Sequence, residues 1–248
     1  MQNNYDRIAD LYDLYVTADY DIGFWKTECA EAGEVLEITA GTGRVTLPLL
    51  KAGVRITAVD VAIHQLERLR NKAKAAGLAV ETVQADMREL ELGKRFPLVI
   101  IPFQSLQELT DSCDVTATLR GVRAHLAEHG RALITLHHPG QQNETNARVL
   151  RLVNDTTLKN GHRLLFWSAR TFDADTNVGT SYQLYEEYDV DGVLHRKRIF
   201  SPTYRVYGRD EFTELAARAG LRITQAWGGY DRSPLTENSC FMIFELRI

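Results

Sequence analysis

A glycine pair and nearby acidic residues lie at spacings that could form a binding site at one edge of a sheet. Residues 37–44 read Glu-Ile-Thr-Ala-Gly-Thr-Gly-Arg, with Gly41 and Gly43 between a strand-like and a helix-like segment. This order of strand, glycine turn and helix lets a nucleotide approach the backbone where a parallel strand ends. A dinucleotide fingerprint would need a further glycine at position 46, where this chain has Thr46, so a pyrophosphate clamp is incomplete.

Each acidic residue follows a predicted strand and suits a different part of one ligand. Glu37 ends the first strand, where its carboxylate attracts an amino group and repels a phosphate. Asp60 ends the second strand, roughly 20 residues after the glycine pair, where a carboxylate accepts hydrogen bonds from both ribose hydroxyls. Asp86 can accept from the exocyclic amine of adenine, and Met87 offers the ring a polarisable surface. A ligand with a ribose, an adenine and an amino-acid cation but no phosphate is S-adenosylmethionine, whose demethylated product is S-adenosylhomocysteine.

The elements that must position these residues alternate between strand-like and helix-like segments. Short runs rich in branched residues predict parallel strands at 35–38, 55–59, 80–83, 98–101 and 132–136. Apolar periodicity and glycine stops predict intervening helices at 45–52, 63–76 and 115–127. Asp210 can cap a last helix, and strands at 221–227 and 241–246 follow it. The expected fold class is α/β, with a Rossmann-like, mostly parallel sheet of seven strands.

A different pattern begins near residue 149. Long aromatic and β-branched runs at 162–172, 178–188 and 193–207 are separated by turn signals, which predicts an antiparallel meander. We expect one domain over 1–248, with its parts in this order: an N-terminal segment (1–30), a core (31–148 and 208–248) and a β-rich insertion (149–207) that caps the site. The tyrosines of the insertion could line an acceptor pocket or a subunit interface, so the chain could form a homodimer.

With these motifs the chain resembles the class I S-adenosylmethionine-dependent methyltransferases. The resemblance covers roughly residues 30–140 and 205–248 and rests on the glycine motif, Asp60, Asp86 with Met87, and residues 102–105. It implies that the last strand of the sheet is reversed. It also implies further cofactor contacts from Thr39, Ala40, Thr42, Arg44, Val61, Pro102 and Phe103. Family members usually have Gly at position 39 and often Cys or Gly at position 40.

The opening of the chain, Tyr5-Asp6-x-x-Ala9-Asp10-x-Tyr12-Asp13, and the insertion resemble small-molecule N-methyltransferases of the glycine and amino-sugar type. In that group an N-terminal lid helix folds over the cofactor, and its tyrosines reach the methyl-transfer site. Tyr5 and Tyr12 are two helical turns apart and share one face. The resemblance implies a cofactor contact from Tyr5 and an acceptor contact from Tyr12, although both could simply pack the helix onto the core.

Methyl transfer needs alignment and desolvation, and it needs a base only where the acceptor must lose a proton. His137 and His138 follow the fifth strand, where either could take such a proton or lie in a surface loop. His138 is preferred, and with Tyr12 and Gln104 it completes the catalytic candidates. The further candidates for acceptor contact, each of which could equally be structural, are His137, Arg205, Tyr207, Tyr230 and Asp231.

Composition excludes several other classes of protein. The chain has 248 residues, with 29 Lys and Arg against 33 Asp and Glu, so its net charge of −4 provides no basic field for nucleic acid or an anionic membrane. The longest apolar run, 96–103, is too short to cross a bilayer. The three cysteines form no CxxC pair, which indicates a reducing compartment and no metal site, and the absence of a signal-peptide pattern indicates the cytoplasm.

The sequence therefore predicts a small-molecule methyltransferase. We expect it to move a methyl group from S-adenosylmethionine to a heteroatom of a small metabolite, nitrogen before oxygen, in secondary metabolism. The alternatives are an O-methyltransferase, a non-catalytic S-adenosylmethionine-binding regulator and an NAD-dependent oxidoreductase. Thr46 disfavours the last of these, because the fingerprint glycine is missing.

Overall fold

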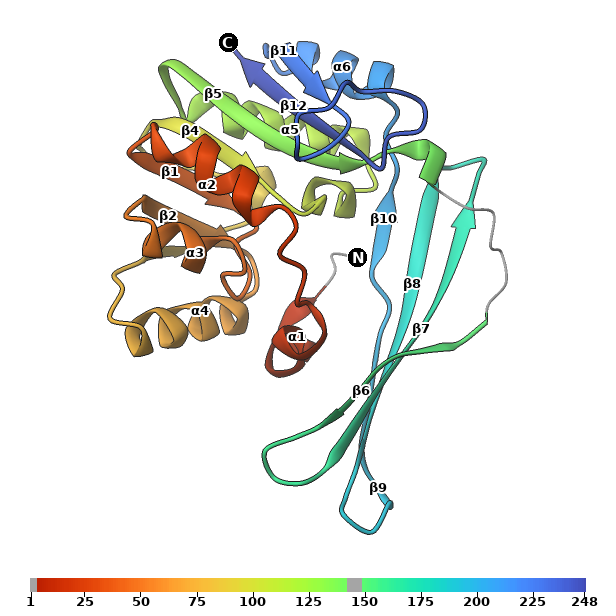
Figure 1. Cartoon of the computed structure of the whole chain (residues 1–248). Coiled ribbons are helices and arrows are strands. Elements are labelled where there is room, and N and C mark those ends of the chain that lie inside the picture. The colour runs from red at the N-terminus through yellow and green to blue at the C-terminus, as the bar shows by residue number, and fades with distance from the viewer. Residues whose placement is uncertain (1–3, 142–148) are drawn as a thin grey trace.

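The computed structural model describes residues 4–141 and 149–248, which form two sheets (Figure 1). The larger sheet has seven strands in the order β11-β12-β5-β4-β1-β2-β3. Their bounds are β1 (Glu34–Ile38), β2 (Arg55–Asp60), β3 (Glu81–Gln84), β4 (Phe96–Ile101), β5 (Leu126–His137), β11 (Arg222–Trp227) and β12 (Phe241–Arg247). Strand β12 is antiparallel to both of its neighbours, β5 and β11, while the other pairs are parallel. The predicted fold class and the reversed last strand are confirmed.

Helices cover both faces of this sheet because its strands are apolar on both sides. In β1, Val35 packs in one buried cluster, while Leu36 and Ile38 pack in another on the opposite face. The Val35 side is covered by α2 (Ile22–Ala30), α3 (Thr46–Lys51) and α4 (Ile63–Ala75). The other side is covered by α5 (Ser112–Ala124) and α6 (Arg209–Arg218). Strands buried on both faces are typical of parallel sheets with crossover helices.

The helix predicted at 115–127 is displaced toward the N-terminus. Asp111 caps α5, since its side chain accepts a hydrogen bond from the Cys113 amide at 2.8 Å. The helix ends at Ala124, and β5 begins at Leu126, so the last predicted helical residues lie in a strand. The capping carboxylate, rather than the first apolar residue of the period, determines where this helix starts.

The smaller sheet is built from residues 151–205. Its strands are β6 (Arg151–Thr157), β7 (Arg163–Asp173), β8 (Val178–Tyr188), β9 (Leu194–Phe200) and β10 (Thr203–Arg205). The strand predicted over 193–207 is divided into β9 and β10 at Pro202, because proline cannot donate the ladder hydrogen bond. Strand β6 was not predicted, and the predicted boundary at residue 148 lies outside the described residues.

The first described part of the N-terminal segment, residues 4–15, lies between the two sheets (Figure 1). The described part of the whole segment forms a 3₁₀ helix, η1 (Tyr5–Ile8), then α1 (Ala9–Tyr15) and, after a break, α2. The expectation of one lid helix over 1–30 therefore differs from the structure, because Val16 leaves helical geometry and is followed by the β-branched Thr17. Side chains of η1 and α1, including Ile8 and Leu11, pack on Leu164, Phe166, Tyr185 and Phe200 of the smaller sheet.

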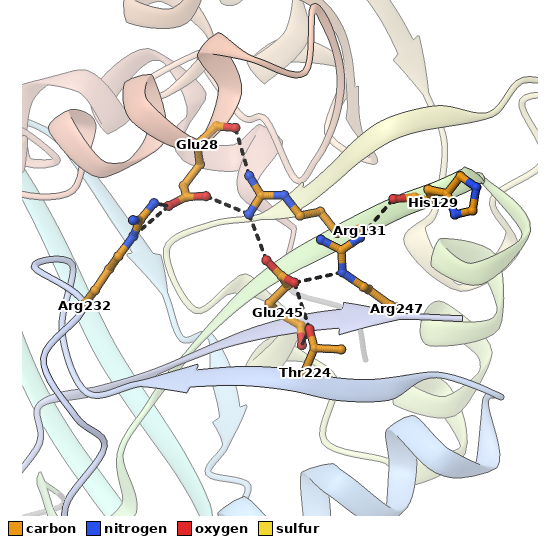
Figure 2. A network of polar contacts seen from close by, with 7 residues as sticks. All are labelled: Glu28, His129, Arg131, Thr224, Arg232, Glu245 and Arg247. Carbon is orange, nitrogen blue, oxygen red and sulfur yellow. Dashed lines mark hydrogen bonds and ion pairs between the residues drawn. The ribbon is translucent and has the colours of Figure 1, made fainter.

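A polar network attaches α2 to β5 and to the antiparallel strand β12 of the larger sheet (Figure 2). The Glu28 side chain is 1% exposed, and its Oε2 accepts a hydrogen bond from Arg131 of β5 at 2.7 Å. The same Arg131 nitrogen lies 3.0 Å from Oε2 of Glu245 on β12. Arg232, in the loop before β12, donates to the other oxygen of Glu28. The network thus joins one helix, two strands and the loop after β11.

The described residues contain no helix that is long and apolar enough to span a membrane. Cys29 is buried, Cys113 and Cys240 are exposed, and all three are free thiols.

Replacing Arg131 with methionine should destabilise the protein by about 3 kcal/mol, because Glu28 would keep a buried charge with one of its two arginine partners removed. The control is Arg218→Met, which removes an exposed pair with Glu214 at 3.4 Å and should cost about 0.5 kcal/mol or less. Urea denaturation measures both changes. Equal losses of unfolding free energy in the two variants would show that the network stabilises the protein no more than a surface ion pair does.

Candidate functional site

The turn after β1 approaches α4 closely, and two glycines allow this. Gly41 and Gly43 have φ of 55° and 87°, in the left-handed region that favours glycine. A side chain at Gly43 would overlap Cδ1 of Leu69 on α4 and lie 3.3 Å from Cγ of Leu47. Thr39, at the position where family members usually have glycine, also has a positive φ of 64°. The glycine turn is therefore a packed and partly strained backbone segment.

Asp60 ties this turn to the end of β2. Its Oδ2 accepts a hydrogen bond from the Gly41 amide, and its Oδ1 accepts one from the Ala62 amide, each at 2.8 Å. Burial raises the pKa of Asp60 above its ordinary value, although these amide hydrogen bonds oppose the rise. The carboxylate is thus held in a defined position at the carboxyl edge of the sheet.

Two cavities are named after the cofactor and the methyl acceptor that the sequence predicts. The first, the cofactor cavity, is narrow and opens beside Asp60. The predicted residues that line it are Tyr5, Tyr12, Thr39, Gly41, Asp60, Val61 and Met87. The residues that were not predicted are Ile38, Val59, Gln65, Ala85, Ser105, Glu108 and Leu109. The side-chain amide of Gln65 is buried, and neither its nitrogen nor its oxygen has a partner among the described residues. A buried, unpaired amide in a cavity marks polar groups that a ligand can satisfy.

A second and larger cavity, the acceptor cavity, lies between the edge of the larger sheet and strands β7, β8 and β10. Its volume is about 450 Å³. Most of its lining is polar: Tyr5, Gln104, Gln107, Glu108, His137, Arg170, Ser181, Gln183, Thr203, Tyr204 and Cys240. Phe103, Pro202 and Phe241 add the remaining surface.

The two cavities meet at one hydrogen bond. Tyr5 and Glu108 line both cavities, and the Tyr5 hydroxyl donates to Oε1 of Glu108 at 2.8 Å. Burial and the adjacent carboxylate raise the pKa of Tyr5 well above its ordinary value, so the hydroxyl keeps its proton. The two cavities therefore adjoin at this hydrogen-bonded pair, with a carboxylate at the junction.

The structure brings His137, not His138, to the acceptor cavity. His137 is the last residue of β5, its ring stacks on Phe241 with centroids 5.9 Å apart, and its amide donates to Oε1 of Gln107 at 2.8 Å. Neighbouring residues of an extended strand point to opposite sides, so His138 turns away and accepts from the Gly140 amide at 3.1 Å. Burial lowers the pKa of His137 to about 4, which makes its imidazole neutral at pH 7.

Gln104 lies in the acceptor cavity on a strained turn. Phe103 and Gln104 both have positive φ, 57° and 60°, and the Gln104 side chain donates to the Tyr230 hydroxyl at 3.2 Å. Tyr230 lies outside the cavity lining, packs among aromatic rings and is linked to the cavity by this hydrogen bond to Gln104. Arg44 lies over the Phe103 ring at 4.1 Å and makes a two-pronged ion pair with Asp21, so it holds this turn from outside the cavity.

Two predicted acidic contacts lie outside the cavity linings. Glu37 is completely buried beneath the glycine turn, where its Oε2 accepts from the Thr46 hydroxyl at 2.7 Å and its Oε1 has no partner among the described residues. Asp86 accepts from the Arg88 amide and guanidinium and caps the short helix η2 (Met87–Glu89). Their roles toward an amino group and adenine remain predictions.

The remaining candidates are not themselves part of either lining. The Thr42 hydroxyl donates to Asp13 at 2.5 Å, and Ala40, Gly43 and Pro102 form the turns around the site. Tyr207 is fully buried and donates to the Leu109 carbonyl, while Arg205 pairs with Glu211 at 2.8 Å. Asp231 is exposed and accepts from the Ser233 amide. For Tyr207, Arg205 and Asp231 these contacts agree with the structural alternative, and the predicted roles of all these residues toward a ligand remain predictions.

Comparisons with known proteins show what the chain is similar to in sequence and fold. Residues 35–130 match the family described as methyltransferase domain. A putative methyltransferase, GWCH70_2453 of Geobacillus sp. (strain WCH70), is 24% identical, with 95% of this chain and 96% of the relative covered. A ubiquinone biosynthesis O-methyltransferase of Rickettsia felis is 26% identical over 41% of this chain and 40% of its own length.

Solved structures show the same fold over nearly the whole chain. The CcbJ methyltransferase from Streptomyces caelestis has a TM-score of 0.80 at 24% identity, covering 98% of this chain and 96% of its own. The chain resembles methyltransferases in both sequence and fold. The sugar N-methyltransferase KedS8 from Streptoalloteichus sp. has a TM-score of 0.78 at 17% identity, over 98% and 93% of the two chains. S-adenosylmethionine-bound CalS10, an amino pentose methyltransferase from Micromonospora echinaspora, has a TM-score of 0.72 at 16% identity and complete coverage of both chains. The resemblance predicted from the sequence is confirmed.

Replacing Gly43 with alanine should destabilise the protein more than the same change at Gly53. Both glycines have nearly equal φ, 87° and 86°, but a side chain at Gly53 meets nothing within 4 Å. Gly53→Ala should therefore cost about 1 kcal/mol from strain alone, and Gly43→Ala about 1–3 kcal/mol more from overlap with Leu69. Denaturation midpoints that match in the two variants would refute the close approach of α4.

Stability should fall with rising pH through the titration of Glu37. Burial raises the pKa of Glu37 from 4.5 to about 8, so the folded state favours the protonated form. This contribution is complete below about pH 4.5 and is lost as the pH rises through about 8, at up to about 1.4 kcal/mol per pH unit. Glu37→Gln should remove the part of the slope of unfolding free energy against pH that Glu37 causes. Glu128→Gln, at an exposed site, should retain this part of the slope. Unfolding free energies at several pH values measure the slopes, and a wild-type slope in Glu37→Gln would contradict the assignment.

Proposed function

We propose that the protein transfers a methyl group from S-adenosylmethionine to a nitrogen of a small, polar metabolite and releases S-adenosylhomocysteine. The observation that carries the proposal is the junction of the two cavities at Tyr5 and Glu108. A non-catalytic binding protein needs the cofactor cavity alone, whereas a transferase needs a second cavity that opens onto the same point.

The residues of the cofactor cavity fit the proposed methyl donor. The fixed carboxylate of Asp60 can accept from ribose hydroxyls, and the unpaired amide of Gln65 can both donate and accept. Val61, Ala85 and Met87 supply an apolar surface for the adenine ring. When bound, S-adenosylmethionine supplies an electrophilic methyl group on a positively charged sulfur.

The acceptor cavity suits an amine better than an alcohol. The Glu108 carboxylate at the junction attracts a protonated amine, which becomes a nucleophile once it has lost its proton to solvent. An alcohol needs a strong base during the transfer, and His137, with its pKa lowered to about 4, is a weak one. His137 can instead accept a hydrogen bond from the acceptor and hold it beside Glu108.

The rest of the cavity favours a metabolite with several hydroxyl groups. Ser181 and Gln183, two positions apart on one face of β8, point into it together with Thr203 of β10. We include an amino sugar or a similar amine of secondary metabolism in the proposal, which agrees with the amino pentose and sugar substrates named for two proteins of the same fold.

Calorimetry with S-adenosylmethionine and S-adenosylhomocysteine tests the first half of the proposal. Asp60→Asn should weaken binding of both by about 10-fold or more, because the amide presents one acceptor oxygen where the carboxylate presents two. Asp175→Asn, at an exposed turn, is the matched control and should bind as the wild type does. Folded wild-type protein that gives no heat with either ligand would refute the proposed cofactor.

Release of S-adenosylhomocysteine from a panel of amino sugars, with the corresponding hydroxyl sugars in parallel, tests the second half. Turnover confined to the amines supports nitrogen, and turnover confined to the hydroxyl sugars overturns it. Glu108→Gln should raise KM for an amine acceptor by about 10-fold, since it removes the charge that attracts the ammonium. Glu128→Gln, which is exposed, should leave KM unchanged.

A further inference from the structure

A cluster of three metal-ligating side chains lies far from the candidate site, at the distal end of the smaller sheet. His162, Glu187 and His195 each offer one ligand atom, and these atoms all lie within 4.8 Å of one another. His162 immediately precedes β7, Glu187 is near the end of β8, and His195 lies near the start of β9. Figure 1 shows this end of the sheet projecting away from the larger sheet.

The strand register explains why the three side chains converge. Glu187 pairs with Leu164 of β7, so His162, two residues before Leu164, lies on the same face as Glu187. On the other side, Glu187 pairs with Arg196 but Tyr188 pairs with Leu194, which leaves His195 as the extra residue of a β-bulge. A bulge re-aims a side chain that regular alternation would place on the opposite face.

Two of the three ligands are already held in place. Nδ1 of His162 lies 2.7 Å from Oε1 of Glu187, and these side chains are 20% and 14% exposed. The backbone of His162 is fixed by its turn, since its carbonyl accepts from the Leu158 amide at 2.7 Å and its amide donates to the Asn160 side chain at 3.1 Å. The His195 ring is exposed and crosses the His162 ring at 71°, with centroids 5.0 Å apart.

We propose that His162, Glu187 and His195 bind a Zn²⁺ ion. Two imidazole nitrogens and one carboxylate oxygen are ligands that Zn²⁺ takes at about 2.0–2.2 Å, with a water in the fourth position. Ligand atoms around such an ion are about 3.3 Å apart, so the exposed His195 ring has only to rotate inward. The exposed Arg196, opposite Glu187, is the cation nearest in register, and the ion would take the place of the direct contact between His162 and Glu187, with the neutral imidazole carrying its proton on Nε2.

A bound ion would cross-link the strands of the smaller sheet at the end that projects away from the larger sheet and the candidate site. The ion would join β7, β8 and β9 at the end of the sheet where a turn at 158–161 leads into β7 and a turn at 189–193 connects β8 to β9. The acceptor cavity is lined by Ser181 and Gln183, at the other end of β8. The cysteine spacing predicted no metal site. The three proposed ligands lie apart in the sequence and are brought together by the register of the strands.

Isothermal titration of the full-length, tag-free and chelator-treated chain with Zn²⁺ tests the proposal. The wild type should bind one ion per chain, and His195→Gln should bind on the order of 100-fold more weakly, as expected when a ligand is lost. The matched control is His64→Gln, which breaks another histidine pair with a carboxylate, to Glu67 at 3.0 Å, that no third ligand joins in the described part of the chain. This control should bind Zn²⁺ as the wild type does.

Thermal unfolding provides an independent readout, because an ion that binds the folded state raises Tm. Zn²⁺ should raise Tm for the wild type and His64→Gln but not for His195→Gln, and Mg²⁺, which prefers oxygen ligands, should raise none of them. Equal Zn²⁺ affinity in His195→Gln and the wild type would overturn the proposal. So would the absence of any Zn²⁺ binding by folded wild-type protein. Neither result depends on methyl transfer, so the two proposals fail separately.

Discussion

The carboxylate of Asp60 accepts hydrogen bonds from the turn after β1 and from the segment after β2, and the candidate site is built on the two strand ends that it joins. Parallel strands deliver their carboxyl ends to one edge, but they do not by themselves fix the loops that follow. The Gly41 amide can reach Asp60 because the glycine turn adopts a positive φ, and the same turn lets α4 pack closely against it. Disturbing this contact would therefore affect both the backbone of the turn and the lining of the cofactor cavity.

The N-terminal segment depends on this core and in turn supports the smaller sheet. Asp13 of α1 accepts hydrogen bonds from Thr42 in the glycine turn and from Lys72 of α4, at 2.5 and 2.9 Å. On its other side, Asp10 pairs with Arg198 of β9, and the Leu14 carbonyl accepts from Asn154 of β6 at 2.9 Å. The tyrosine at the junction of the two cavities thus belongs to a segment that is fastened to both sheets.

The reversal of the last strand was implied by the family resemblance, whereas local pattern was sufficient to predict the parallel strands and the residues of the glycine turn, Asp60 and Met87. Each of these follows from a short stretch of sequence in which strand, turn and helix are adjacent. Local pattern could not decide which of His137 and His138 faces the acceptor cavity. Successive side chains point to opposite sides of a strand, so the answer depends on the exact residue at which β5 ends. Glu108 and Gln65 carry no motif, and they were missed because only the docking of the N-terminal segment and the smaller sheet places them in a cavity.

The two cavities draw on different parts of the chain. Among the described residues, all those that line the cofactor cavity lie outside 151–205. Arg170, Ser181, Gln183, Pro202, Thr203 and Tyr204 of the acceptor cavity lie within this range. Substitutions in β7, β8 and β10 can therefore change the lining of the acceptor cavity without replacing any described residue of the cofactor cavity. Proteins with this fold could therefore differ in the residues that line the acceptor cavity while they keep those that line the cofactor cavity.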